Sequence, residues 1–281
     1  MPELNSLSDA ARAVRQQDRD RFVTALFAPA DRRQALFVLY AFNLEIARAR
    51  ELVREPMLGR IRLQWWRDCL TALYAGQDGG QPLARELGAV IAHHGLAETE
   101  FTLLLDSRES DMNDQPPADL AAMESYAEGT AAPLARLALA VLDAKGETDL
   151  EVARHVGIAW ALTGLLRAVP YHAAAKRLYL PLDLLEKHGV SQQQIFSGKG
   201  SPGLILVGQE ISTLARSHLR QARLHSGQVA RQALSPLLTA PLAESYLDAL
   251  DKSGGDLLST DWSRVRPRPM RLAWCAFRGR I

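Results

Sequence analysis

The chain of 281 residues is long enough for one large domain with a substantial core, or for two small ones. Its apolar fraction of 47% and charged fraction of 23% are those of an ordinary globular protein, and a net charge of +1 speaks against a nucleic-acid partner. The two cysteines, Cys69 and Cys275, exclude a disulfide framework and indicate a reducing compartment.

The start of the chain lacks the pattern of a targeting segment. No basic stretch precedes an apolar core within the first residues, and the early acids Glu3, Asp9 and Asp18 are untypical of a mitochondrial presequence. The uncharged run from His155 to Leu166 is too short to cross a bilayer, which needs about 20 residues. We therefore expect a cytoplasmic protein that is at most peripheral to a membrane.

Apolar residues recur at helical spacing along nearly the whole chain. The first pattern runs from Leu36 to Ala47 after a start signal at Pro29, and a later one ends at His94 before Gly95. Further helices are expected around Ile61 to Ala72 and at 97–112, 119–143, 149–168, 203–226 and 235–250. No segment shows repeated period-two alternation, so the sequence predicts a single all-α domain over residues 1–281.

The last segment, 261–281, forms a basic C-terminal arm in which six arginines stand against one acid. They are interleaved with Trp262, Trp274 and Phe277. One interpretation is contact with an anionic membrane surface, where aromatic rings settle at headgroup level. The other is a final helix that packs these rings into the core. The arginines are Arg264, Arg266, Arg268, Arg271, Arg278 and Arg280.

Two segments combine charge with helical pattern. On a continuous helix Arg48 and Glu51 would be neighbours, as would Asn43, Ala47 and Arg50, although solvated charges on an amphipathic helix explain this equally well. Further along, Arg167 lies near the end of an apolar helix that Pro170 should break or kink. That arginine needs a partner or solvent, or it complements the helix dipole. His172 beside it is either a satisfied core histidine or a pocket base.

Other clusters carry weaker signals. Lys176 and Arg177 precede Tyr179 and could bind phosphate, or could form a solvated loop. The acids at 106, 109, 111 and 114 are expected on a solvated face, and Trp65-Trp66 as one core and one surface residue. Motifs of nucleotide-binding loops, zinc proteases and serine hydrolases do not occur.

Several short pieces in order resemble the squalene/phytoene synthase family. They are Arg21-Phe22, Leu26 to Pro29, Arg32-Arg33, Leu39 to Phe42, Trp65 to Arg67, Leu162 to Arg167, Tyr179 to Pro181 and Gly189 to Ser191. The resemblance implies the all-α isoprenoid synthase fold with a central apolar cavity. It further implies that the cavity and an anion-binding mouth involve Tyr40, Asn43, Arg48, Arg167, Tyr171, His172, Lys176, Arg177 and Tyr179.

Family enzymes join two prenyl diphosphates and need two aspartate-rich motifs, because Mg²⁺ requires hard oxygen ligands. By the resemblance, the first motif falls on Ala47, Arg48 and Glu51, and the second on Ala168, Tyr171 and His172. Only Glu51 is an acid. The resemblance therefore implies a pseudoenzyme with no catalytic residues, no metal site and no cofactor; Mg²⁺ is expected only if the chain is an active enzyme.

The stretch from Leu166 to His172 also resembles the corresponding segment in the branch of this family that assembles respiratory complex I in mitochondria. This implies a non-catalytic protein whose partners are complex I subunits or assembly intermediates, in the cytoplasm or, in a eukaryote, the mitochondrial matrix. Two alternatives stay open: an active prenyltransferase of the squalene or phytoene type, and a carrier that holds a prenyl lipid or quinone in the cavity.

Overall fold

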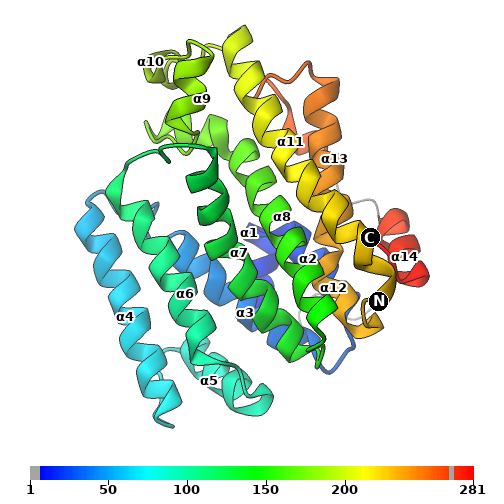
Figure 1. Ribbon diagram of the computed structural model, residues 1–281. Coiled ribbons are helices and arrows are strands. Elements are labelled where there is room, and N and C mark those ends of the chain that lie inside the picture. Colours follow the sequence, from blue (N-terminus) through cyan, green and yellow to red (C-terminus); the bar gives the residue numbers. More distant parts are fainter. Residues whose placement is uncertain (1–6, 266–268) are drawn as a thin grey trace.

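The computed structural model describes residues 7–265 and 269–281, and over these residues it contains helices and their connections but no strand (Figure 1). The all-α prediction is confirmed. The residues used above to judge the start of the chain, Met1 to Ser6, lie outside this range. So do Arg266 and Arg268 of the C-terminal arm.

The helices follow one another with short connections. The N-terminal half consists of α1 (Asp9–Gln17), α2 (Arg19–Ala25), α3 (Arg33–Ala47), α4 (Pro56–Tyr74), α5 (Pro82–His94), α6 (Glu98–Glu109) and α7 (Leu120–Val141). The C-terminal half consists of α8 (Glu147–Ala174), α9 (Leu182–Lys187), α10 (Gln192–Phe196), α11 (Pro202–His225), α12 (Leu234–Leu237), α13 (Thr239–Lys252) and α14 (Pro269–Arg278).

Local sequence explains where several helices begin and end. The side chains of Ser8, Asp119 and Ser201 accept hydrogen bonds from the first turns of α1, α7 and α11, which satisfies otherwise unpaired backbone N–H groups. Gly95 ends α5 in the left-handed conformation at φ 60°, as its position after His94 predicts.

Helix α8 lies at the centre of the molecule, between α7 on one side and α11 on the other (Figure 1). One group of buried residues joins α8 to α11 and α13, and a second joins α3 to α4, α5 and α6. Helix α7 contributes to both, through Met123 and Leu139 to the first and through Leu134 and Leu137 to the second. Helices α3 and α8, at whose ends the resemblance places the two motifs, thus both pack against α7.

Helix α3 ends at Ala47, where its apolar pattern ends, so Arg48, Arg50 and Glu51 lie in the turn that follows; Arg48 and Glu51 are still neighbours there, 3.9 Å apart. The end predicted for the later helix, at residue 168, is wrong. Helix α8 does not end near Arg167 but continues past Pro170 to Ala174. Burial of Val169 and Ala173 in the core stabilises this last turn against the missing N–H of the proline.

Trp66 is buried and Trp65 is exposed, so the division into one core and one surface residue is confirmed. The C-terminal arm contains α14, which packs on the body through Leu272 but leaves the rings of Trp274 and Phe277 exposed. Among the described residues, the longer helices are too polar for any of them to cross a membrane.

Candidate functional site: a cavity and an adjoining cleft

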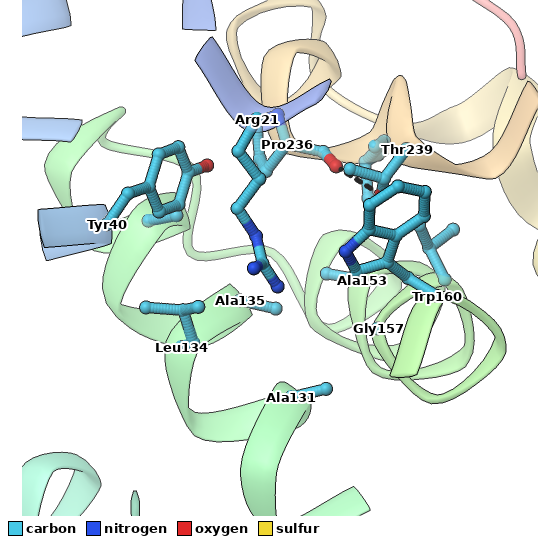
Figure 2. Close-up of a pocket in the computed structure, with 13 residues that line it drawn as sticks. Arg21, Tyr40, Ala131, Leu134, Ala135, Ala153, Gly157, Trp160, Pro236 and Thr239 are labelled. Carbon is cyan, nitrogen blue, oxygen red and sulfur yellow. Dashed lines mark hydrogen bonds between the residues drawn. The ribbon is translucent and has the colours of Figure 1, made fainter. Parts of the chain in front are cut away.

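A cavity lies between α2, α3, α7 and α8, in two adjacent parts that share Arg21, Ala131 and Trp160. The smaller part has a volume of about 30 Å³ and the larger part about 190 Å³. Figure 2 shows the smaller part, where the side chain of Arg21 extends between the rings of Tyr40 and Trp160. The larger part is lined by polar groups from several helices, namely Asn43, Arg108, Tyr126 and Thr130.

The polar side chains of this cavity are partly satisfied by the protein. Arg21 donates a hydrogen bond to Asp18 at 2.9 Å. Burial raises the pKa of Tyr40 to about 12, so its phenol stays neutral. The side-chain oxygen of Asn43 is buried and accepts no hydrogen bond from the protein. A ligand that carries a hydrogen-bond donor would satisfy this oxygen.

A wider cleft of about 610 Å³ adjoins the cavity, with which it shares Trp160 and Gly164. Arg167 lines it and forms an ion pair with Asp20 at 3.4 Å. Tyr246 donates a hydrogen bond to the same Asp20 oxygen at 2.8 Å. Burial raises the pKa of Asp20, an effect that Arg167 partly offsets. Arg167 is therefore already partnered by a carboxylate of the chain itself.

Beyond the cavity wall, a buried polar network contains one of the acids that we expected in solvent. Asp111 is buried and accepts a hydrogen bond from Tyr126 at 2.8 Å, and Arg108 lies 3.5 Å from it. The solvated-face prediction is wrong for Asp111, because the short helical turn at 110–113 directs it inward. It holds in part for Asp106 and Glu109, which pair with Arg67 at the surface.

The ends of α3 and α8, which carry the two motif positions, are joined by an ion-pair cluster. Asp114 accepts two hydrogen bonds from Arg50, at 3.0 and 2.6 Å, and lies 3.9 Å from Arg177. Arg177 also donates a hydrogen bond to the carbonyl of Arg50 at 3.3 Å. Arg50 follows the first motif helix and Arg177 follows the second. The side chains of Arg50, Arg177 and Asp114 thus connect these two helix ends.

The structure distributes the predicted site residues over separate places. Tyr40 and Asn43 line the cavity, and Arg167 and Ala168 line the cleft. The ring of His172 packs at a tilt against that of Tyr179, with ring centres 4.4 Å apart, outside the cavity and the cleft, and burial lowers the pKa of His172 to about 4. Tyr171 is 56% exposed, and Lys176 is exposed in a left-handed turn at φ 54°. Arg48 pairs with Glu51 at 3.9 Å and contacts Gln17.

Sequence patterns did not reveal several residues that build the site. These are Asp20, Arg21, Arg108, Tyr126, Trp160 and Tyr246. One local signal existed: Arg108 and Asp111 are three apart on a helical pattern, a spacing at which opposite charges meet. The others come together only through contacts between helices far apart in the chain.

The donor set at the six positions to which the resemblance assigns the two motifs does not fit a cluster of Mg²⁺ ions. The six positions carry two methyl groups, a guanidinium, a phenol, an imidazole and one carboxylate. Mg²⁺ prefers hard oxygen ligands in octahedral geometry. Over residues 7–265 and 269–281, no group of three or more histidine, cysteine, aspartate or glutamate side chains is arranged to hold a metal ion.

The family follows from a comparison of the sequence with family models. The model described as squalene/phytoene synthase matches residues 14–271, which is most of the chain. The chain belongs to the squalene/phytoene synthase family. The fold agrees: the structure superposes on a dehydrosqualene synthase with a TM-score of 0.82, at 16% identity and covering 95% of this chain and 94% of that one. A squalene synthase from Alicyclobacillus acidocaldarius gives a TM-score of 0.76 at 20% identity, covering 87% and 92%.

Within this family, relatives of two kinds resemble the chain, assembly factors and a synthase. Assembly factor 6 of NADH dehydrogenase (ubiquinone) complex I from Bos taurus is 30% identical over 89% of this chain and 75% of its own length. The Homo sapiens protein is 30% identical over 87% and 73%. Presqualene diphosphate synthase from Rhodopseudomonas palustris is 29% identical, over 58% of each chain. The likeness to the assembly factors therefore extends further along the sequence.

Proposed function

We propose that this protein is a non-catalytic member of the squalene/phytoene synthase family that assists the assembly of respiratory complex I. The observation that carries the proposal is the chemistry at the ends of α3 and α8. The resemblance places metal ligands at six positions there, and this chain offers one carboxylate, Glu51, which is paired with Arg48. Without the metal ions, ionisation of an allylic diphosphate lacks its main source of charge stabilisation.

The length over which the relatives match this chain supports the same proposal. The assembly factors match most of the chain, whereas presqualene diphosphate synthase matches little more than half of it. The partners would be complex I subunits or assembly intermediates on the cytoplasmic face of the membrane, or on the matrix face in a eukaryote. The cavity and cleft could in addition hold the head of a prenyl lipid or quinone while the partner is assembled.

A first experiment tests the absence of catalysis. Purified protein is mixed with Mg²⁺ and farnesyl or geranylgeranyl diphosphate, and diphosphate release is followed beside the Rhodopseudomonas palustris synthase as positive control. We expect no release above background. Turnover of even about 0.1 s⁻¹, against the roughly 1–10³ s⁻¹ typical of enzymes, would refute the proposal and favour the alternative, an active prenyltransferase.

A second experiment tests the role in assembly. Deletion of the gene in its host should lower assembled, NADH-oxidising complex I and leave squalene- and phytoene-derived lipids unchanged. Rescue is then compared for wild type and Tyr171→Ala, which alters an exposed side chain at the second motif without disturbing the core. Leu103→Ala, also exposed but on α6, is the matched control. Normal complex I in the deletion strain would contradict the proposal.

A further inference from the structure

Helix α14 has an apolar face that residues 7–265 leave uncovered. Met270, Trp274 and Phe277 recur at spacings of four and three residues and so lie on one side of the helix. They are 87%, 58% and 72% exposed, and the rings of Trp274 and Phe277 stack with centres 6.1 Å apart. We call these three residues the outer stripe. Figure 1 shows α14 at the edge of the molecule, so the stripe is accessible from solvent.

The opposite side of α14 is fixed to the body. Leu272 is buried in the core, and Arg271 donates a hydrogen bond to Ser245 at 3.0 Å and pairs with Glu244 on α13. Arg231 donates a hydrogen bond to the carbonyl of Phe277 at 3.2 Å. Contacts of the inner side therefore keep the outer stripe facing solvent. The body of the protein cannot bury both sides of α14 at once.

Cationic side chains flank the stripe. Arg278 lies over the Trp274 ring, 5.6 Å from its centre, and both it and Arg280 are exposed. From Pro269 to Ile281 the sequence contains no acid. A guanidinium beside an exposed indole is the combination that suits lipid phosphates above an acyl layer, because the ring settles at headgroup level and the cation binds the phosphate.

We propose that α14 docks this protein on the surface of an anionic membrane, with the outer stripe inserted at the boundary between headgroups and acyl chains. The size of the stripe favours a lipid surface over a protein partner. A helix of ten residues presents a face of about 15 Å by 10 Å, far below the roughly 800 Å² that each partner buries in a stable protein interface. A bilayer needs no such area, since a short basic amphipathic helix binds it reversibly.

Docking would also place one wall of the cleft close to the membrane. Trp262, Ser263 and Val265 line the cleft together with Arg167, and they belong to the segment that leads into α14. The proposal does not depend on the assembly role or on catalysis, because membrane docking requires neither complex I nor a prenyl diphosphate.

The test is co-sedimentation of the full-length protein with vesicles. Vesicles of phosphatidylglycerol and phosphatidylcholine are compared with vesicles of phosphatidylcholine alone, at low and high salt. Wild type is expected to sediment with the anionic vesicles and to be released by salt, which screens the arginines. Trp274→Ser/Phe277→Ser should lower the partition coefficient at least about tenfold, and Arg278→Gln/Arg280→Gln about fivefold per arginine.

Leu103→Ser removes an apolar side chain that is 47% exposed, on α6, and should bind as wild type. Circular dichroism shows that each variant keeps its helical content. Equal binding of wild type to both vesicle types, an unaffected stripe variant, or equal weakening by Leu103→Ser would overturn the proposal. So would failure to bind anionic vesicles at low salt. If the stripe variant instead abolishes self-association in size-exclusion chromatography, the stripe is a protein interface and the proposal is wrong.

Discussion

The guanidinium of Arg167 lies over the ring of Tyr246, with its central carbon 3.6 Å from the centre of the ring. The same guanidinium and the Tyr246 hydroxyl both contact one oxygen of Asp20. Helices α2, α8 and α13 meet at this contact. The three side chains thus link a helix near the start of the chain and a helix near its end to the central helix α8. An arginine that the sequence offered as an anion-binding candidate is thus engaged with an anion of the protein.

Removing Arg167 should therefore destabilise the fold. Arg167→Ala leaves Asp20 buried beside a phenol alone, and we expect the free energy of unfolding to fall by about 3–5 kcal/mol. Tyr246→Phe removes one hydrogen bond to a charged group and should cost about 1.5–3 kcal/mol. Urea denaturation followed by circular dichroism measures both. In an Asp20→Asn background Arg167→Ala should cost less, and an undiminished loss there would show that Asp20 is not the partner that matters.

His172 makes the stability depend on pH. Burial, and to a lesser degree Arg177, lower its pKa to about 4 from the ordinary 6.5, so the unfolded chain binds the proton more tightly. The resulting stability is fully present above pH 6.5 and is lost as the pH falls towards 4. Between pH 7 and pH 5 the loss should be about 2 kcal/mol.

A His172→Phe variant, which keeps a ring against Tyr179, should lose correspondingly less stability between pH 7 and pH 5. Urea denaturation at both pH values gives the comparison. His94, His155 and His218 also have lowered pKa values, but they titrate alike in both proteins and cancel in the difference. Identical pH profiles for the two proteins would contradict the assignment to His172.

The Arg50–Asp114 ion pair should respond unequally to the loss of each partner. Arg50 has a side chain only 7% exposed, whereas that of Asp114 is 41% exposed. Asp114→Ala leaves a buried guanidinium with little to balance it and should cost about 3 kcal/mol. Arg50→Met leaves a carboxylate that water can reach, and we expect about half that loss. Thermal denaturation of the two single variants and the double variant gives the coupling; a larger effect of Arg50→Met would contradict this account.

Substitutions of Gly164 can distinguish a function that needs a ligand in the cavity from one that needs the protein surface alone. It lines both the cavity and the cleft, and a Cβ atom built there meets no other atom within 4 Å. Gly164→Ala should stabilise the helix by about 0.5–1 kcal/mol, because glycine is the more flexible residue in a helix interior. Gly164→Leu should stay folded, and its larger side chain should narrow the opening between the cavity and the cleft.

The same pair of variants can be introduced into the deletion strain. If a bound lipid or quinone is required for assembly, Gly164→Leu should fail to restore complex I while Gly164→Ala restores it. If the protein acts through its surface alone, both should restore it. Loss of function in Gly164→Ala as well would indicate that the glycine is needed for another reason.

The sequence alone determined the fold class and most of the helices. Apolar spacing and local end signals are properties of neighbouring residues, so α5 ends before Gly95 as predicted and α11 lies within one residue of its expected range. The resemblance to the family rests likewise on short contiguous pieces, and the match over residues 14–271 agrees with it.

The tertiary structure decided how the charges of the site are used. Asp20 and Tyr246 are 226 positions apart and meet through a hydrogen bond that no local pattern records. In the sequence, Asp111 belongs to a cluster of acids that are expected in solvent. In the structure, it accepts a hydrogen bond from Tyr126 on α7. Helix α8 continues through Pro170 because burial of Val169 and Ala173 outweighs a local rule. Helical periodicity is a property of one or two turns and can be read from the sequence. The partner of a buried charge depends on which helices pack together.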